Sequence, residues 1–179
     1  MTQRGATLLE LIVVLAVAAI LLMIAAPAFS HLLHASRLTS ATNALVASIH
    51  VARSEAIKRS QRVVICPSPA GDACAGAGGW QQGWMIFHDA NNNAQRDAGE
   101  ALVLTHPPLP AGMWVTSKGS TARYLSYTPA GDTKQVGGGF QAGTLTLCHA
   151  SAAPDSARQV VVYRTGRPRT AKTSVAACP

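Results

Sequence analysis

Residues 6–29 of the chain read ATLLELIVVLAVAAILLMIAAPAF, an apolar run in which Glu10 carries the only charge. From Leu11 to Phe29 the run holds 19 uncharged residues, and a helix needs about 20 to cross a bilayer. A short basic leader, residues 1–5, precedes the run. A carboxylate within such a segment costs roughly 2.5–3.5 kcal/mol on insertion scales. We therefore expect Glu10 to meet a counter-charge on a partner.

The small residue in front of the apolar run distinguishes this N-terminus from a secretory signal. A secretory signal is cleaved after its apolar segment and loses that segment, whereas Gly5 precedes the run. Cleavage after Gly5 leaves the helix on the mature chain and gives Ala6 a new α-amino group. That ammonium group, on a neighbouring copy, is the expected counter-charge for Glu10. The alternative, an ordinary single-span membrane anchor, leaves Glu10 unexplained.

This arrangement resembles the class III signal of type IV pilins and pseudopilins. The resemblance implies that a prepilin peptidase cuts after Gly5 and methylates Ala6, a position where the family usually has Phe. It also implies a single-pass protein of the inner membrane with a periplasmic head. After cleavage the protein is expected in a cell-surface pilus, with other pilin subunits as partners.

The helical pattern continues beyond the apolar run. Apolar residues recur there at steps of three and four, which places them on one stripe of a helix. We predict one helix from about Leu8 to Arg59, roughly 75–80 Å long at 1.5 Å per residue. Pro27 removes one helical hydrogen bond and predicts a kink or local melting. The stripe comprises Leu38, Ala41, Leu45, Ile49, Ala52 and Ala56.

Seven short segments with the composition of β-strands follow the helix, each bounded by Gly, Pro, Asn or Asp. Their spacing predicts an antiparallel sheet or a small sandwich, with the three tryptophans expected in the core. The fold class is therefore α+β, and the resemblance implies a type IV pilin fold. Its expected parts are a leader (1–5), a transmembrane assembly helix (6–29), an amphipathic helix (30–60) and a β-rich head with a basic tail (61–179). The predicted strands are 62–66, 83–89, 101–105, 113–116, 123–128, 143–148 and 158–165.

Four cysteines lie beyond the apolar run, namely Cys66, Cys74, Cys148 and Cys178. An even count in an exported domain predicts two disulfides. Of the three possible pairings we favour Cys66–Cys74 and Cys148–Cys178, because each closes a loop within one region of the chain. No spacing of Cys and His suits zinc.

A second resemblance covers most of residues 4–105. The segment 52–59 and the strand ending at Cys66, then Trp80, the 83–87 strand and the loop 89–100, are similar to the GspH/FimT family. Membership implies a minor pilin or pseudopilin rather than an enzyme. No Gly-x-Ser-x-Gly, Walker loop or His-Glu-x-x-His motif is present, and we expect no cofactor.

The loop 89–100 carries oxygen ligands at the spacing of an EF-hand calcium loop. However, Ala94 replaces the glycine of the sharp turn, and the flanks have the pattern of strands rather than helices. The alternative is a hairpin loop whose Asp and Asn side chains bond their own backbone. We favour that alternative and expect no metal. The candidate ligands are Asp89, Asn91, Asn93, Asp97 and Glu100.

The C-terminal segment is strongly basic in a chain whose net charge is +7. No acidic residue follows Asp155. Pro168 fixes its own φ and favours an extended Arg167, and Gly166 is expected to act as a hinge. We therefore expect an extended loop, stapled by the Cys148–Cys178 bridge, that presents two guanidinium groups suited to phosphate oxygens. The basic residues are Arg158, Arg164, Arg167, Arg169 and Lys172.

The pattern Gly166-Arg167-x-Arg169 resembles the tail motif of the FimT branch of the family. The resemblance implies that pili bind double-stranded DNA through its phosphates during natural transformation. Arg158, Arg164 and Lys172 are expected to add electrostatic support. The rival hypothesis is a structural subunit that primes or caps a type IV pilus or a type II secretion pseudopilus without binding DNA. A solvated basic surface with no ligand is the third possibility.

Overall fold

The computed structural model describes residues 7–150 and 157–178, so the predicted cleavage position at Gly5 and Ala6 lies outside it. Its first element, α1 (Leu8–Arg59), is one helix of 52 residues, about 78 Å long. The Thr7 side chain caps its N-terminus by accepting the Glu10 amide at 3.3 Å. The predicted helix is confirmed. Of the two outcomes predicted at Pro27, local melting is wrong, because α1 remains helical through it and a proline removes only one hydrogen bond from the ladder. A kink there stays a prediction.

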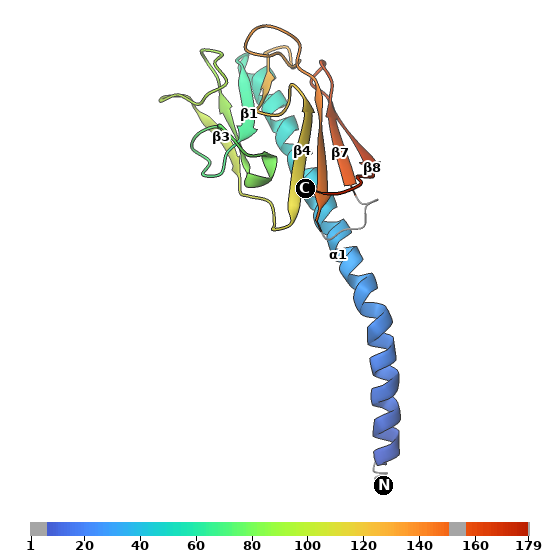
Figure 1. Ribbon diagram of the computed structural model, residues 1–179. Coiled ribbons are helices and arrows are strands. Elements are labelled where there is room, and N and C mark those ends of the chain that lie inside the picture. Colours follow the sequence, from blue (N-terminus) through green and yellow to red (C-terminus); the bar gives the residue numbers. More distant parts are fainter. Residues whose placement is uncertain (1–6, 151–156, 179) are drawn as a thin grey trace.

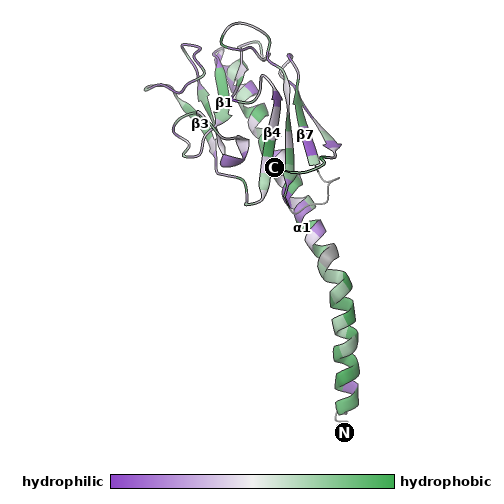
Figure 2. Ribbon diagram, in the orientation of Figure 1, coloured by the Kyte–Doolittle hydropathy of each residue, from purple (hydrophilic) through white to green (hydrophobic). Residues whose placement is uncertain are grey.

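The N-terminal half of α1 projects from the head as a bare helix (Figure 1). Its surface is almost wholly apolar (Figure 2), and no residue of its most apolar window is buried. Within the described residues, α1 is the one helix long and apolar enough to cross a membrane. Such a helix needs a bilayer or other helices around it, because water solvates it poorly.

The head contains two four-stranded antiparallel sheets, built from the eight strands of the described residues. One sheet has the order β3-β2-β1-β5 and the other β4-β6-β7-β8. A short 3-10 helix, η1 (Trp80–Gln82), leads into β2. The strands are β1 (Val63–Pro67), β2 (Trp84–His88), β3 (Leu102–His106), β4 (Met113–Gly119), β5 (Leu125–Tyr127), β6 (Gly143–His149), β7 (Ala157–Val162) and β8 (Pro168–Thr173).

All seven predicted strands are present with shifted ends, but the sequence pattern missed β8. This strand has the sequence PRTAKT and an almost fully exposed pattern, so it lacks the apolar alternation that marks a strand. It forms an edge, where a proline at the first position is tolerated. The tryptophan prediction is also partly wrong, because Trp114 on β4 is 39% exposed while Trp80 and Trp84 are buried.

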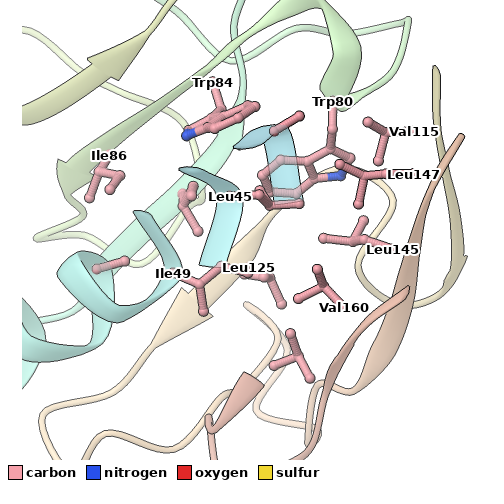
Figure 3. Close-up of a cluster of buried hydrophobic side chains, with 14 of the residues drawn as sticks. Leu45, Ile49, Trp80, Trp84, Ile86, Val115, Leu125, Leu145, Leu147 and Val160 are labelled. Atoms are coloured by element: carbon pink, nitrogen blue, oxygen red, sulfur yellow. The ribbon is translucent and has the colours of Figure 1, made fainter. Parts of the chain in front are cut away.

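The C-terminal half of α1 supplies one wall of the core. All six residues of the predicted stripe are buried. Leu45 and Ile49 lie in the same buried cluster as Trp80, Trp84 and the apolar residues of β6 and β7 (Figure 3). Burial of each such large side chain contributes about 1.5–3 kcal/mol. Both sheets contact the same helix. The helix therefore fixes the position of one sheet relative to the other, and with it the positions of the loops at their ends.

Two buried histidines make the stability of the head depend on pH. Burial, followed by the charge of Arg59, holds the pKa of His88 below its ordinary value, although Glu55 acts in the opposite direction. Burial also lowers the pKa of His149, with a further contribution from His34. The rings of His34 and His149 lie 4.3 Å apart, which joins α1 to the end of β6.

We expect acid to destabilise the head. A folded pKa below the unfolded value gives stability that is present above pH about 6.5 and is lost as the pH falls through the lowered folded pKa. Circular-dichroism melts of the full-length chain in detergent should show Tm falling between neutral and mildly acidic pH, by about 2–4 °C for each kcal/mol lost. The variant His88→Gln/His149→Gln should flatten this profile, whereas His50→Gln, at an exposed site, should not. A double variant with the wild-type profile would contradict the assignment.

Candidate functional site

The basic turn between β7 and β8 stands at the end of the head farthest from the N-terminus (Figure 1). The two strands pair as far as Val162 and Pro168, and the turn occupies residues 163–167. Arg164, Arg167 and Arg169 are all exposed. The prediction that an extended loop presents both arginines is wrong for Arg169, which lies on β8. The sequence of β8 does not predict a strand, and β8 is one because its backbone pairs with β7.

Neighbouring segments hold this turn tightly. The Tyr127 hydroxyl donates to the Gly166 carbonyl oxygen at 3.0 Å, and burial raises the pKa of Tyr127 well above its ordinary value. The Thr133 amide donates to the Arg164 carbonyl oxygen at 3.1 Å, and the Gly166 amide closes the turn onto Tyr163 at 2.8 Å. The backbone of the turn is therefore fixed while its arginine side chains face solvent.

Gly166 does not fit the expected role of a hinge. It is buried, and its φ of +73° lies in the left-handed region that favours glycine. A Cβ atom at this position would come within 2.2 Å of the Gly131 carbonyl oxygen. Gly131 is itself held, since the Arg53 guanidinium Nε donates to that same oxygen at 2.9 Å. Gly166 thus allows two backbone segments to come close together instead of providing flexibility.

Arg158 and Lys172 form a separate group. They face each other across the β7–β8 ladder, and directly paired residues share one face of a sheet. Arg169, three residues before Lys172, lies on the opposite face because side chains alternate along a strand. Arg158 and Lys172 instead line a cavity of about 240 Å³ beside α1. The other lining residues are Thr39, Thr42, Asn43, Thr170 and Ala171.

Lys134 follows a residue whose backbone binds the turn, a neighbourhood that the sequence pattern did not predict. It is exposed and follows Thr133, whose amide binds the turn. A polar loop carries no sequence signal for such a contact. The ion pairs of the described residues all involve Glu55. The cations of the turn therefore make no ion pair with any described residue. The carboxylate of Asp132, which also adjoins Thr133, accepts the Thr128 hydroxyl instead.

Both predicted disulfides are present. Cys66 and Cys74 lie 5.6 Å apart between Cα atoms. Cys148 and Cys178 lie 5.8 Å apart and tie the segment after β8 to β6. The second bridge closes a loop that contains β7, the basic turn and β8. Such a loop closure restricts the unfolded chain and holds the hairpin to the head.

The loop 89–100 is a hairpin loop that bonds itself. Both carboxylate oxygens of the buried Asp89 accept backbone amides, from Asn93 at 3.0 Å and Ala94 at 3.1 Å. Glu100 accepts the amides of Ala90 and Asp97 in the same way. The side-chain amides of Asn91 and Asn93 donate to Asp97 at 2.8 and 2.7 Å. This network matches the hairpin loop that we favoured over a calcium site, in which the side chains bond the backbone of their own loop. In the described ranges no group of three or more His, Cys, Asp or Glu side chains is placed to hold a metal.

Glu10 lies in the first turn of α1 and is exposed. A carboxylate there is favourably placed next to the helix N-terminus. Glu10 makes no ion pair with any residue in the part of the chain that the structure describes. Its side chain is therefore available to a group on another molecule.

Sequence comparison identifies two families. Residues 41–166 match the family described as Type II transport protein GspH, and residues 1–26 match the Prokaryotic N-terminal methylation motif. The Pilin-like protein PilA1 of Thermus thermophilus is 37% identical over 106 residues. That match covers 59% of this chain and 61% of the relative, so it spans less than two thirds of the relative's length.

Solved structures share the fold. The type IV minor pilin FimU of Pseudomonas aeruginosa superposes with a TM-score of 0.60 at 21% identity, covering 80% of this chain and 96% of FimU. The minor pseudopilin EpsH from the Type 2 Secretion System of Vibrio cholerae gives a TM-score of 0.51 at 9% identity, covering 80% of this chain and 99% of EpsH. The head and the long helix therefore have the type IV pilin fold, and these relatives are pilins and pseudopilins rather than enzymes.

Proposed function

Because the chain belongs to the GspH family of pilin-like proteins, we propose that it is a minor type IV pilin that binds extracellular double-stranded DNA for uptake in natural transformation. The helix α1 is the assembly element of this proposal, and the β7–β8 turn is its DNA-binding element. The proposal adds a particular ligand, DNA, to what the shared pilin fold implies. It is supported by the docked turn and its exposed arginines.

Assembly follows from the N-terminus. A prepilin peptidase removes residues 1–5 at the inner membrane and methylates Ala6, consistent with the N-terminal methylation motif. The bare half of α1 then moves from the bilayer into the core of a filament, where helices of other pilin subunits cover it. Glu10 pairs with the α-amino group of a neighbouring subunit, and this pair offsets the cost of a carboxylate in an apolar environment.

DNA binding rests on one observation, a rigid turn that carries exposed arginines without ion pairs to the described residues. Because Tyr127 and Thr133 hold the backbone, little conformational entropy is lost when a ligand binds. Guanidinium groups form paired hydrogen bonds with phosphate oxygens. Phosphate contacts carry no sequence information, so binding should be weakly selective for sequence. The contacting side chains are Arg164, Arg167, Arg169 and Lys134.

A gel-shift and anisotropy titration of the full-length chain in detergent tests this proposal. Three to five phosphate contacts predict a Kd of roughly 10⁻⁴–10⁻⁶ M and a log–log salt slope of roughly −3 to −4.5. The variant Arg167→Gln/Arg169→Gln should abolish the gel shift and reduce the slope by about 2, without changing Tm, because both side chains are exposed.

The matched control is Arg158→Gln/Lys172→Gln, which removes the same charge from the separate cavity beside α1. This variant should weaken duplex binding much less. Equal losses in the two double variants would show that net charge, rather than the turn, accounts for binding. Wild-type affinity in the Arg167/Arg169 variant would overturn the site.

The second candidate function is a structural minor subunit that primes or caps a pilus or a type II secretion pseudopilus. The fold shared with FimU and EpsH favours it. A capping role gives no reason for exposed arginines on the turn that lack an acidic partner in the described head. If the arginine double variant supports normal filament assembly and the wild type binds no DNA, this candidate is the better description.

A further inference from the structure

Two exposed aromatic side chains lie on the basic turn and on a neighbouring segment. Phe140 is 68% exposed and Tyr163 is 50% exposed. They stand on adjacent segments, because the Thr133 hydroxyl lies 2.6 Å from the Gln141 carbonyl oxygen and 3.2 Å from that of Tyr163. A single exposed apolar side chain is ordinary on a protein surface. Two exposed aromatic residues next to the candidate site indicate a contact surface.

Each aromatic ring has a cation next to it. The guanidinium carbon of Arg169 lies 6.0 Å from the centroid of the Tyr163 ring, at the outer limit of a cation–π contact. Phe140 pairs with Lys134 in an isolated antiparallel bridge, which places the two Cβ atoms about 4.5–5.5 Å apart.

We propose that Phe140 and Tyr163 form a stacking surface for unpaired nucleobases, so that this end of the head binds single-stranded DNA more tightly than duplex DNA. This inference rests on the proposed DNA-binding function and specifies the form of the ligand. In a duplex the faces of the bases are stacked on one another, so the rings have no base face to contact and the arginines bind mainly to phosphates. An unpaired strand offers phosphates to the cations and base faces to the rings, which is the combination used by proteins that bind single strands.

The charges around the rings favour nucleic acid over a protein partner. Four exposed cations lie on the turn, on β8 or on the segment that pairs with Phe140, namely Lys134, Arg164, Arg167 and Arg169. Interfaces between proteins also use arginine and aromatic residues, but any partner that covers these cations has to neutralise them, because burying an unpaired charge is costly. A polyanion with exposed aromatic faces satisfies both the cations and the rings.

Fluorescence anisotropy on the full-length chain in detergent tests the inference. The probe is a labelled strand of about 16 nucleotides, near the upper limit of single-strand site sizes, compared with a duplex of the same sequence. We expect the single strand to bind about five-fold or more tightly than the duplex. Phe140→Ala and Tyr163→Ala should each weaken single-strand binding about five-fold or more, while duplex binding changes less than about two-fold. Phe140→Leu, which keeps an apolar side chain without a ring, should lose as much as Phe140→Ala.

Salt dependence separates stacking from charge. The aromatic variants should lower affinity by the same factor at low and high salt and leave the slope unchanged, because stacking releases no counterions. Arg167→Gln/Arg169→Gln should reduce the slope for both ligands. The matched control is Val136→Ala, which removes an exposed aliphatic side chain from the loop that carries Phe140. This variant should bind both ligands like the wild type.

Three results would overturn the inference. The first is equal loss of single-strand and duplex binding in the aromatic variants, and the second is no loss of either. Both leave DNA binding by the arginines intact, so the proposed function survives them. The third is a wild-type chain that binds neither ligand, which removes the proposed function as well. If the second result comes with loss of the aromatic variants from filaments, the rings belong to a contact between subunits.

Discussion

Gly166→Ala is expected to destabilise the head by about 2–6 kcal/mol, the sum of a backbone cost and a packing cost. A side chain at φ +73° costs about 1–3 kcal/mol in backbone strain. The added Cβ meets the Gly131 carbonyl oxygen at 2.2 Å and the Tyr127 ring at 2.8 Å, so backbone must move rather than the end of a flexible side chain. That movement breaks the Tyr127–Gly166 hydrogen bond and leaves buried polar groups unsatisfied, at a further cost of about 1–3 kcal/mol.

Thermal melts of the full-length chain measure this effect as a Tm lower by roughly 10 °C, from about 2–4 °C for each kcal/mol. Gly138→Ala is the matched control, because Gly138 has a similar φ of +85° but a Cβ added there would meet no described atom within 4 Å beyond its own chain neighbours. It isolates the cost of positive φ and should lower stability by about 1–2 kcal/mol. Tyr127→Phe removes only the hydrogen bond and should fall between the two. If Gly166→Ala and Gly138→Ala have the same Tm, the close approach of Gly166 to Gly131 does not contribute to stability.

The long helix was predictable because its signal is periodic. Leu38, Leu45 and Ile49 recur at helical spacing, and the same positions are buried against both sheets. The seven predicted strands carry apolar and β-branched residues that mark strands without knowledge of their partners. Disulfide pairing was also accessible, because each pair lies within one region of the chain.

The basic site was only partly predictable. The residues were identified, but their division into two groups depends on the register of β8, whose pairing comes from β7 and not from its own composition. Once that register is known, alternation separates Arg169 from Lys172. Lys134 and Gly166 depend on contacts between distant segments. A glycine next to a basic motif has the composition of a hinge, and only the Gly131 contact distinguishes a close approach from flexibility.

Glu10→Ala is expected to remove the protein from filaments while leaving it in the membrane. The substitution takes a carboxylate out of the apolar segment and so favours insertion by roughly 2.5–3.5 kcal/mol. Ala is also a better helix former than Glu, and the side chain makes no ion pair within the described residues. The membrane-inserted monomer should therefore be at least as stable as the wild type. Assembly should fail, because the α-amino group of the neighbouring subunit enters the filament core without a counter-charge.

The measurement compares the amount of protein in sheared pili with the amount in membranes, by immunoblot, in a strain that expresses the other pilin subunits. We expect incorporation to fall about ten-fold or more, which corresponds to about 1.4 kcal/mol of lost pairing. Glu10→Asp keeps the charge on a shorter side chain and should retain part of the incorporation, whereas Glu10→Gln keeps the size without the charge and should resemble Glu10→Ala. Leader cleavage, followed by mass, checks that each variant reaches the peptidase normally. Wild-type incorporation of Glu10→Gln would show that size and not charge is recognised, and the pairing of Glu10 with a neighbouring amine would then have to be abandoned.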